Sequence, residues 1–142
     1  MSIGIVAART IISGAEAHAK SQALKPLAVV VLDAGGHVRA AERADGASNM
    51  RFEIARAKAF GAIALGMDSR ALMERAEVQP YFVTSAGAAI GGALIPVPGG
   101  VLVRDGEGTV IGAVGVSGDS SDNDEAAAIA GIEAAGLIGP TR

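Results

Sequence analysis

The chain has 142 residues, a length that predicts one domain, over residues 1–142, with a sizeable buried core. Its net charge is −3 and its basic residues are scattered, so we expect no nucleic-acid interface. No stretch approaches the roughly 18 consecutive apolar residues of a membrane-spanning helix, and there is no cysteine for a disulfide or a thiolate nucleophile. The first ten residues have no basic segment ahead of an apolar one, which predicts a cytoplasmic protein without a signal peptide.

Small aliphatic side chains dominate the composition. Half of the residues are hydrophobic but only 3% are aromatic, so the core has to be built from alanine, valine, isoleucine and leucine. Glycine accounts for 20 residues, about twice its usual share of roughly 7%. A short chain that is this apolar, and has no membrane span, is expected to hide part of its surface in a homo-oligomer.

The first part of the chain predicts a helix followed by a β-hairpin. Apolar residues recur at helical spacing over residues 3–23, and Pro26 ends that pattern. The continuous apolar run over residues 27–32 predicts a strand that is buried on both faces. After a turn at residues 33–37, residues 38–44 predict a second strand, which returns beside the first.

Two further helices are expected in the middle of the chain. Residues 49–65 share an apolar helical face, and Gly66 is a suitable stop at the C-terminal end. Asp68 or Ser69 can cap a short third helix that runs through Glu77.

The last third of the chain predicts two strands and a helix. Apolar runs at residues 101–103 and 110–116 are separated by a glycine-rich turn, which is typical of a hairpin. A final helix is expected over residues 122–135, capped by Asp122 or Asn123.

These elements together predict an α+β fold. Residues 80–86 are expected to form a short strand or an extended loop, and residues 87–93 a loop that leads into the next strand. Counting that segment, the antiparallel sheet has about five strands and is flanked by helices, because hairpin-linked strands and helices grouped outside them favour that architecture.

Four motifs in order along the chain carry a resemblance to a known family. They are Val29–Val38 followed by Arg43–Ala47, Ile54–Ala59, Pro98–Gly100, and Gly115–Gly118. The chain resembles the GlcG/HbpS-like family, which includes haem-binding proteins and the C-terminal domain of PduO-type proteins. The resemblance implies a profilin-like fold and a high-order homo-oligomer, such as an octamer built from dimers. It does not imply one function, because the family is functionally mixed.

Arg43 and Asp45 are candidate site residues at the end of the second strand. If the strand continues that far, alternation places both side chains on one side. The arginine fork suits a carboxylate or phosphate, and Asp45 could orient it or act as a catalytic base. The alternative is a salt bridge beside a turn. The resemblance favours the functional interpretation, because this stretch matches a motif of the family.

Lys58 is the second candidate catalytic residue. It lies on an alanine-rich helix, where a partly buried lysine could bind an anion or have a lowered pKa. The alternative is one more charge that faces solvent.

A proline-glycine-glycine turn and a serine are the remaining candidate ligand-binding residues. Pro98-Gly99-Gly100 predicts a tight turn whose uncovered N–H groups could hold an oxyanion, although the turn could also be a simple strand bend. The family commonly has a proline after this glycine pair, whereas this chain has Val101. Ser117 opens a polar loop before the last helix, a place where small anions often bind and where a well-capped turn is the alternative. Its surroundings do not match the nucleophile elbow of serine hydrolases.

No metal site is predicted. His18 and His37 lack the spacing of a metal-binding pair. The acidic residues near the last helix complement the helix dipole and lack the order of a calcium-binding loop. They are Asp119, Asp122, Asp124 and Glu125.

Three functions fit these observations. The first is a protein of carbon catabolism, a setting that the resemblance implies. It binds a small anionic organic acid and could transform it by proton transfer, hydration or hydrolysis without a redox cofactor. The second, which the resemblance implies, is a haem-binding or haem-degrading protein with haem as its cofactor. Iron usually takes an axial His, Met, Cys or Tyr, and the chain offers His18, His37, Tyr81 and four methionines. The third is a non-catalytic accessory protein that acts as an oligomer.

Overall fold

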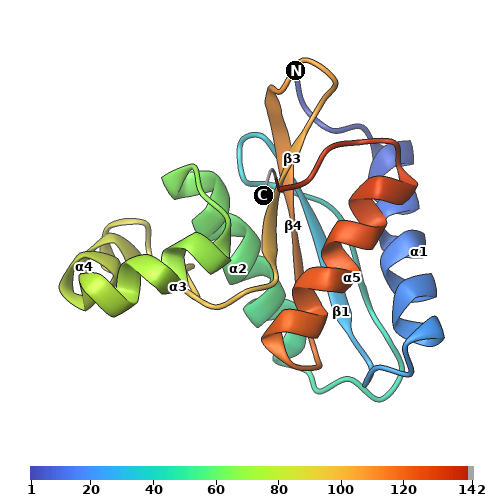
Figure 1. The fold of residues 1–142 in the computed structure, drawn as a ribbon, viewed down its shortest axis with the longest axis horizontal. Coiled ribbons are helices and arrows are strands. Elements are labelled where there is room, and N and C mark those ends of the chain that lie inside the picture. The colour runs from blue at the N-terminus through green and yellow to red at the C-terminus, as the bar shows by residue number, and fades with distance from the viewer. Residues whose placement is uncertain (141–142) are drawn as a thin grey trace.

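The computed structural model describes residues 1–140 and contains five helices and four strands in that part of the chain (Figure 1). Their order along the chain is α1 (Ile5–Ser21), β1 (Ala28–Asp33), β2 (Val38–Arg43), α2 (Arg51–Leu65), α3 (Ser69–Val78), α4 (Pro80–Ala89), β3 (Gly100–Arg104), β4 (Val110–Ser117) and α5 (Ser121–Ala134). The expected α+β class is therefore confirmed. The observed boundaries of most elements differ by only a few residues from those expected.

The four strands form one antiparallel sheet in the order β2-β1-β4-β3. The two hairpins supply the outer pairs, and β1 pairs with β4 in the middle of the sheet. All but the last residue of β1 are buried, as expected for a strand that is covered on both faces.

The expectation of about five strands is wrong by one, because Pro80–Ala89 is a helix. Tyr81, Phe82 and Val83 favour strands on their own. Pro80, however, occupies the first helical position, where a missing N–H costs nothing, and alanines follow. The helix, α4, makes most of its contacts with α3. Together these two helices extend sideways from the sheet (Figure 1).

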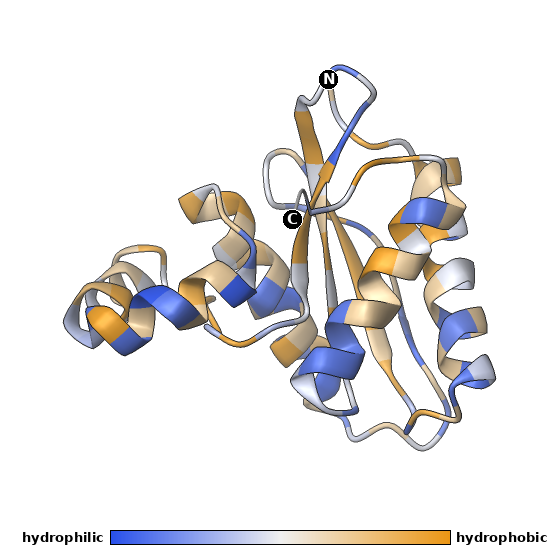
Figure 2. Cartoon of the chain, in the orientation of Figure 1, coloured by the Kyte–Doolittle hydropathy of each residue, from blue (hydrophilic) through white to orange (hydrophobic). Residues whose placement is uncertain are grey.

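Helices cover both faces of the sheet. Helices α1 and α5 pack against each other and cover one face, while α2 covers the other (Figure 1). Alternate residues of β1 divide between the two sides: Val29 and Val31 belong to the core under α1 and α5, and Val30 and Leu32 to the core under α2. The hydrophobic colouring of the central strands agrees with this burial (Figure 2).

Helix ends were predicted in part. Gly66 adopts the left-handed conformation that ends α2, with φ of +69°, as expected. The cap of α5 is Ser120, whose hydroxyl accepts a hydrogen bond from the N–H of Asn123 at 3.1 Å. The expected caps, Asp122 and Asn123, instead lie inside the first turn of α5.

Glycine lets α2 approach the middle of the sheet. A Cβ atom on Gly115 of β4 would lie 1.8 Å from the carbonyl oxygen of Ala55 in α2. The nearest atoms are the backbone of Ala55 and the Cβ of Ala59, and neither is the end of a flexible side chain that could move aside. The position therefore needs glycine because of packing.

Replacing Gly115 with alanine is expected to lower the free energy of unfolding by about 3 kcal/mol, because the added methyl group forces α2 away from the sheet. Urea unfolding followed by circular dichroism measures the change. Gly106→Ala is the matched control, since a Cβ atom there meets nothing within 4 Å. Equal stability of the two variants would contradict this account of the packing.

Candidate functional site

A buried ion pair joins α2 to the start of α5. The Lys58 side chain passes beside β4, is 2% exposed as a residue, and ends among polar atoms. Its Nζ donates hydrogen bonds to the carbonyl oxygen of Val116 at 2.9 Å and to Oδ2 of Asp124 at 3.1 Å. The expected lysine is therefore inside the protein, and it has a partner that the sequence analysis assigned to the helix dipole.

Burial opposes both charges of this pair. Desolvation lowers the pKa of Lys58, while the negative charge of Asp124 acts in the opposite direction. Desolvation likewise raises the pKa of Asp124, and Lys58 partly offsets that effect. The other carboxylate oxygen of Asp124 accepts a hydrogen bond from the N–H of Asp119 at 2.9 Å. The pair thus links the sheet to the loop that precedes α5.

The turn Pro98-Gly99-Gly100 lies directly against Lys58. A Cβ atom on Gly99, whose φ is +129°, would approach Nζ of Lys58 to 2.8 Å. One on Gly100 would come within 2.3 Å of the Lys58 carbonyl oxygen. The glycine pair is therefore required by the close approach of two backbone segments and a buried lysine.

The N–H of Gly100 is already in use. It donates to Oγ of Ser69 at 2.7 Å, and the same hydroxyl donates back to the Gly100 carbonyl at 3.2 Å. Ser69 is fully buried. An oxyanion at this turn would have to displace Ser69 in order to reach that N–H. The hydroxyl of Ser69 therefore competes with the ligand that we expected Gly100 to bind.

Ser117 and Arg51 lie next to the ion pair. Nη1 of Arg51 donates to the buried hydroxyl of Ser117 at 3.0 Å. The positive charge of Arg51 also contributes to the lowered pKa of Lys58, after the larger effect of desolvation. Two cations and a hydroxyl therefore gather at this end of β4.

Arg43 lies on the same face of the sheet, because both it and Ser117 pair with Ala28 of β1. Its guanidinium donates to the carbonyl oxygen of Ala47 at 2.5 Å.

Asp45 does not share this environment. β2 ends at Arg43, so the strand alternation that would have put both residues on one side does not extend to Asp45. Asp45 instead lines a cavity of about 540 Å³ together with Glu42 and residues of α1. The structure thus brings Lys58, Ser117, Pro98, Gly99 and Gly100 together and places Asp45 elsewhere.

A second set of ionic contacts lies beside the buried pair and was not expected. Nε of Arg70, in α3, contacts Oε2 of Glu125 at 3.1 Å, and its Nη2 contacts the carboxylate of Asp122. These hydrogen bonds raise the pKa of Arg70. Arg70 has no motif around it, and only the acidic first turn of α5 indicated that a cation would be needed there.

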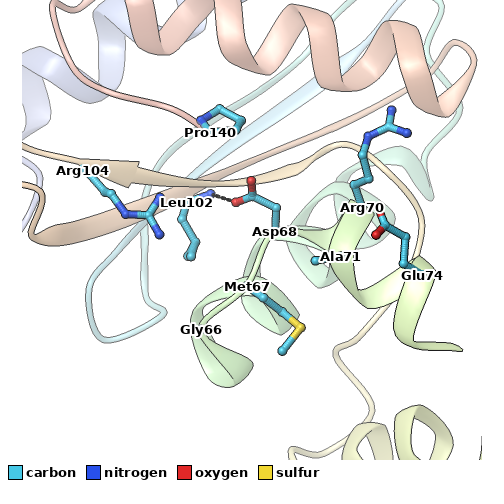
Figure 3. A pocket seen from close by; sticks show the side chains of 9 residues that line it. All are labelled: Gly66, Met67, Asp68, Arg70, Ala71, Glu74, Leu102, Arg104 and Pro140. Carbon is cyan, nitrogen blue, oxygen red and sulfur yellow. Dashed lines mark hydrogen bonds between the residues drawn. The ribbon is translucent and has the colours of Figure 1, made fainter. Parts of the chain in front are cut away.

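A smaller cavity of about 280 Å³ lies at the junction of α2, α3 and β3 (Figure 3). Met67 lines it, together with the side chains of Asp68 and Arg104. Oδ1 of Asp68 accepts a hydrogen bond from the N–H of Leu102 at 2.8 Å, which fixes the start of α3 to β3. The guanidinium of Arg70 points away from this cavity, toward α5 (Figure 3).

Neither a metal cluster nor a membrane span is found in residues 1–140. That part of the chain has no group of three or more His, Cys, Asp or Glu residues placed to hold a metal ion. None of its helices is both long and apolar enough to cross a membrane.

Comparison with protein families identifies the chain. The family model described as "Haem degrading protein HbpS-like" matches residues 4–133. This chain belongs to the HbpS-like family. The match covers the ion pair, the glycine turn and both cavities except for Pro140, so the resemblance drawn from the four motifs is confirmed.

Solved structures share the fold over nearly the whole chain. Protein ORFY of Klebsiella pneumoniae is 27% identical, with a TM-score of 0.84 and coverage of 94% of this chain and 90% of that one. A structure of HbpS is 25% identical, with a TM-score of 0.80 and coverage of 94% and 89%. A complex of PduOC with haem is 23% identical, with a TM-score of 0.85 and coverage of 97% and 98%, and shows likeness of fold alone. Among curated protein sequences, none matches this one significantly.

Removing one partner of the buried ion pair is expected to destabilise the protein. Lys58→Met leaves the Asp124 carboxylate buried without its cation, which should lower the free energy of unfolding by about 3–5 kcal/mol. The double variant Lys58→Met/Asp124→Asn should lose less than the sum of the two single variants. Urea unfolding measures all three, with Lys20→Met, at an exposed position, as the control. Strict additivity would show that the two side chains do not interact.

Proposed function

We propose that this protein binds haem. The observation that carries the proposal is the HbpS-like family match over residues 4–133, whose description names haem degradation. Three of the similar solved structures have HbpS or a haem complex as their subject. Among the three functions considered from the sequence, haem binding is the one that these relatives support.

The smaller cavity has residues that could bind one edge of the haem ring. Haem iron is commonly held by a thioether or an imidazole, and its propionates pair well with arginine. Met67 and Arg104 supply a thioether and a guanidinium in one cavity (Figure 3). The volume of about 280 Å³ is small for such a ligand, so most of the ring would remain outside.

The other candidate axial ligands are less well placed for a haem in either of these cavities. His18, His37 and Tyr81 line neither of the two. The larger cavity has lysines but no His, Met or Tyr in its wall. Met67 would therefore hold haem through its thioether, and Arg104 would hold a propionate. Bound haem would supply iron redox chemistry, while these residues orient it.

Haemin titration followed by visible absorption tests this assignment. We expect a saturable Soret shift near one haem per chain, and Met67→Leu is expected to change the position of the Soret band because the thioether is lost. Met50→Leu is the matched control, since Met50 is exposed and lines neither cavity. Arg104→Ala should weaken binding about tenfold through the loss of one charge-assisted contact.

The titration tests haem binding itself, and the variant tests whether Met67 holds the iron. A flat response of the unaltered protein would overturn haem binding altogether. Saturable binding with an unchanged Soret band in Met67→Leu would retain the function and reject Met67 as the ligand.

A small organic acid is the second candidate ligand, favoured by the cations around Ser117. Arg51 and Lys58 lie at one end of β4, and Arg43 lies on the same face of the sheet. Arginine forks suit carboxylates. Lys58 is buried and paired, so Arg51 and Arg43 are the groups that a carboxylate could reach. Under this proposal Lys58 holds the site in place, whereas its predicted catalytic role would require the pair with Asp124 to open.

The chain is also proposed to assemble into a homo-oligomer. Helices α3 and α4 extend away from the sheet, and Val78 and Tyr81 there are 78% and 68% exposed. Large exposed apolar side chains on these projecting helices are suited to a contact between subunits. This fits the prediction from composition that part of the surface is hidden in an oligomer.

Light scattering coupled to size-exclusion chromatography measures the subunit number, for which the resemblance implies eight. Tyr81→Glu is expected to lower the mass of the particle, because a charge would be buried at the contact. Val6→Glu, at an equally exposed valine on α1, should not change it. A monomeric unaltered protein would contradict the assembly.

A further inference from the structure

The larger cavity has a wall of mixed character. It lies between the second half of α1, the loop that leads to β1, and the end of β2, with a volume of about 540 Å³. That volume lies within the usual range of small-molecule pockets. Leu24, Pro26 and Leu27 provide an apolar side, and charged residues from α1 and β2 provide the other. Of the candidate site residues selected from the sequence, only Asp45 lines this cavity.

One carboxylate oxygen in this wall lacks a donor. Oε1 of Glu16 is shielded from solvent and has no hydrogen-bond partner among residues 1–140, although Glu16 as a whole is only partly buried. A buried polar atom without a partner costs about 1–3 kcal/mol, more when the group is charged, and native structures rarely leave one unexplained. A ligand that brings a hydrogen-bond donor into the cavity would remove this cost.

The charges around Glu16 select the kind of donor. Glu42 lies on the α1 side of the sheet because it pairs with Val29, whose side chain belongs to the core under α1. Asp45 follows β2 and lines the same cavity. Three acidic residues from two parts of the chain therefore line one cavity, and their negative charges disfavour an anionic occupant.

The two lysines in the wall do not neutralise this side. Lys20 and Lys25 are both exposed, so their ammonium groups can remain in water. The charge of Lys25 also interacts with Asp119, whose carboxylate accepts a hydrogen bond from the Lys25 N–H at 2.8 Å.

We propose that this cavity binds a small organic ammonium compound. The ammonium group donates to Glu16 and is attracted by Glu42 and Asp45, while its alkyl part packs against Leu24 and Leu27. Three N–H donors and a positive charge satisfy what the carboxylates lack. This proposal concerns a different cavity from that assigned to haem and does not depend on haem binding.

Ligand-observed NMR with n-butylammonium chloride tests the proposal. Saturation transfer from the protein to n-butylammonium is expected, and unlabelled protein without haem is sufficient. Sodium butyrate and n-butanol, of the same chain length, should show little or no transfer, because one is repelled and the other lacks the charge. Transfer to all three compounds alike would reject charge selection, and absence of transfer to n-butylammonium would overturn the proposal.

Glu16→Gln locates the site. The amide has the same shape and can still accept a hydrogen bond but carries no charge, so n-butylammonium should bind about tenfold more weakly because the hydrogen bond is no longer charge-assisted. Glu77→Gln, an exposed acidic residue of α3, is the matched control and should bind as the unaltered protein does. Unchanged affinity in Glu16→Gln would place the ligand elsewhere. Should that variant fail to fold, Glu42→Gln is expected to weaken binding in the same direction.

Discussion

The buried contact between Lys58 and Asp124 is the constraint around which the rest of the site is arranged. Two charges far from water have to be close together, since each alone would be strongly disfavoured. Their pairing fixes the distance between α2 and the start of α5, and these elements lie in different layers of the protein. The Gly99-Gly100 turn then needs glycine, because the lysine and its backbone occupy the space where side chains would be.

The resemblance and the sequence pattern were sufficient for the family and for most of the fold. Apolar periodicity located α1, α2 and both hairpins, because in these elements local preference agrees with burial. The segment from Pro80 was misassigned for the opposite reason. Its tyrosine, phenylalanine and valine favour a strand, but no strand partner is near and α3 offers a helical one. Neither fact can be read from the local sequence.

Some of the residues that meet around Lys58 could be selected from the sequence, whereas its ion-pair partner, which is distant along the chain, could not. Lys58 and the Pro98–Gly100 turn were selected separately from the sequence, and the structure brings them into contact, while their role in ligand binding stays a prediction. Asp124 was interpreted as a partner of the helix dipole. Its contact with Lys58, which is 66 positions away along the chain, cannot be read from the sequence. Asp45 was expected beside Arg43, but it lies two residues beyond the end of β2, where the alternation of side chains along the strand no longer holds.

Three consecutive residues at the start of α3 bond to two different elements. Asp68 holds β3 at Leu102, Ser69 holds the turn at Gly100, and Arg70 holds α5 at Glu125. Helix α3 is also the main support of α4. These three hydrogen-bonding side chains therefore join the projecting helices to β3 and to α5 directly. Leu94, in the segment that follows α4, adds a second connection because it lies close to Gly61 of α2 and Gly87 of α4. The position of the projecting helices relative to the sheet is thus fixed at more than one point, so a partner that binds them would meet a preformed surface.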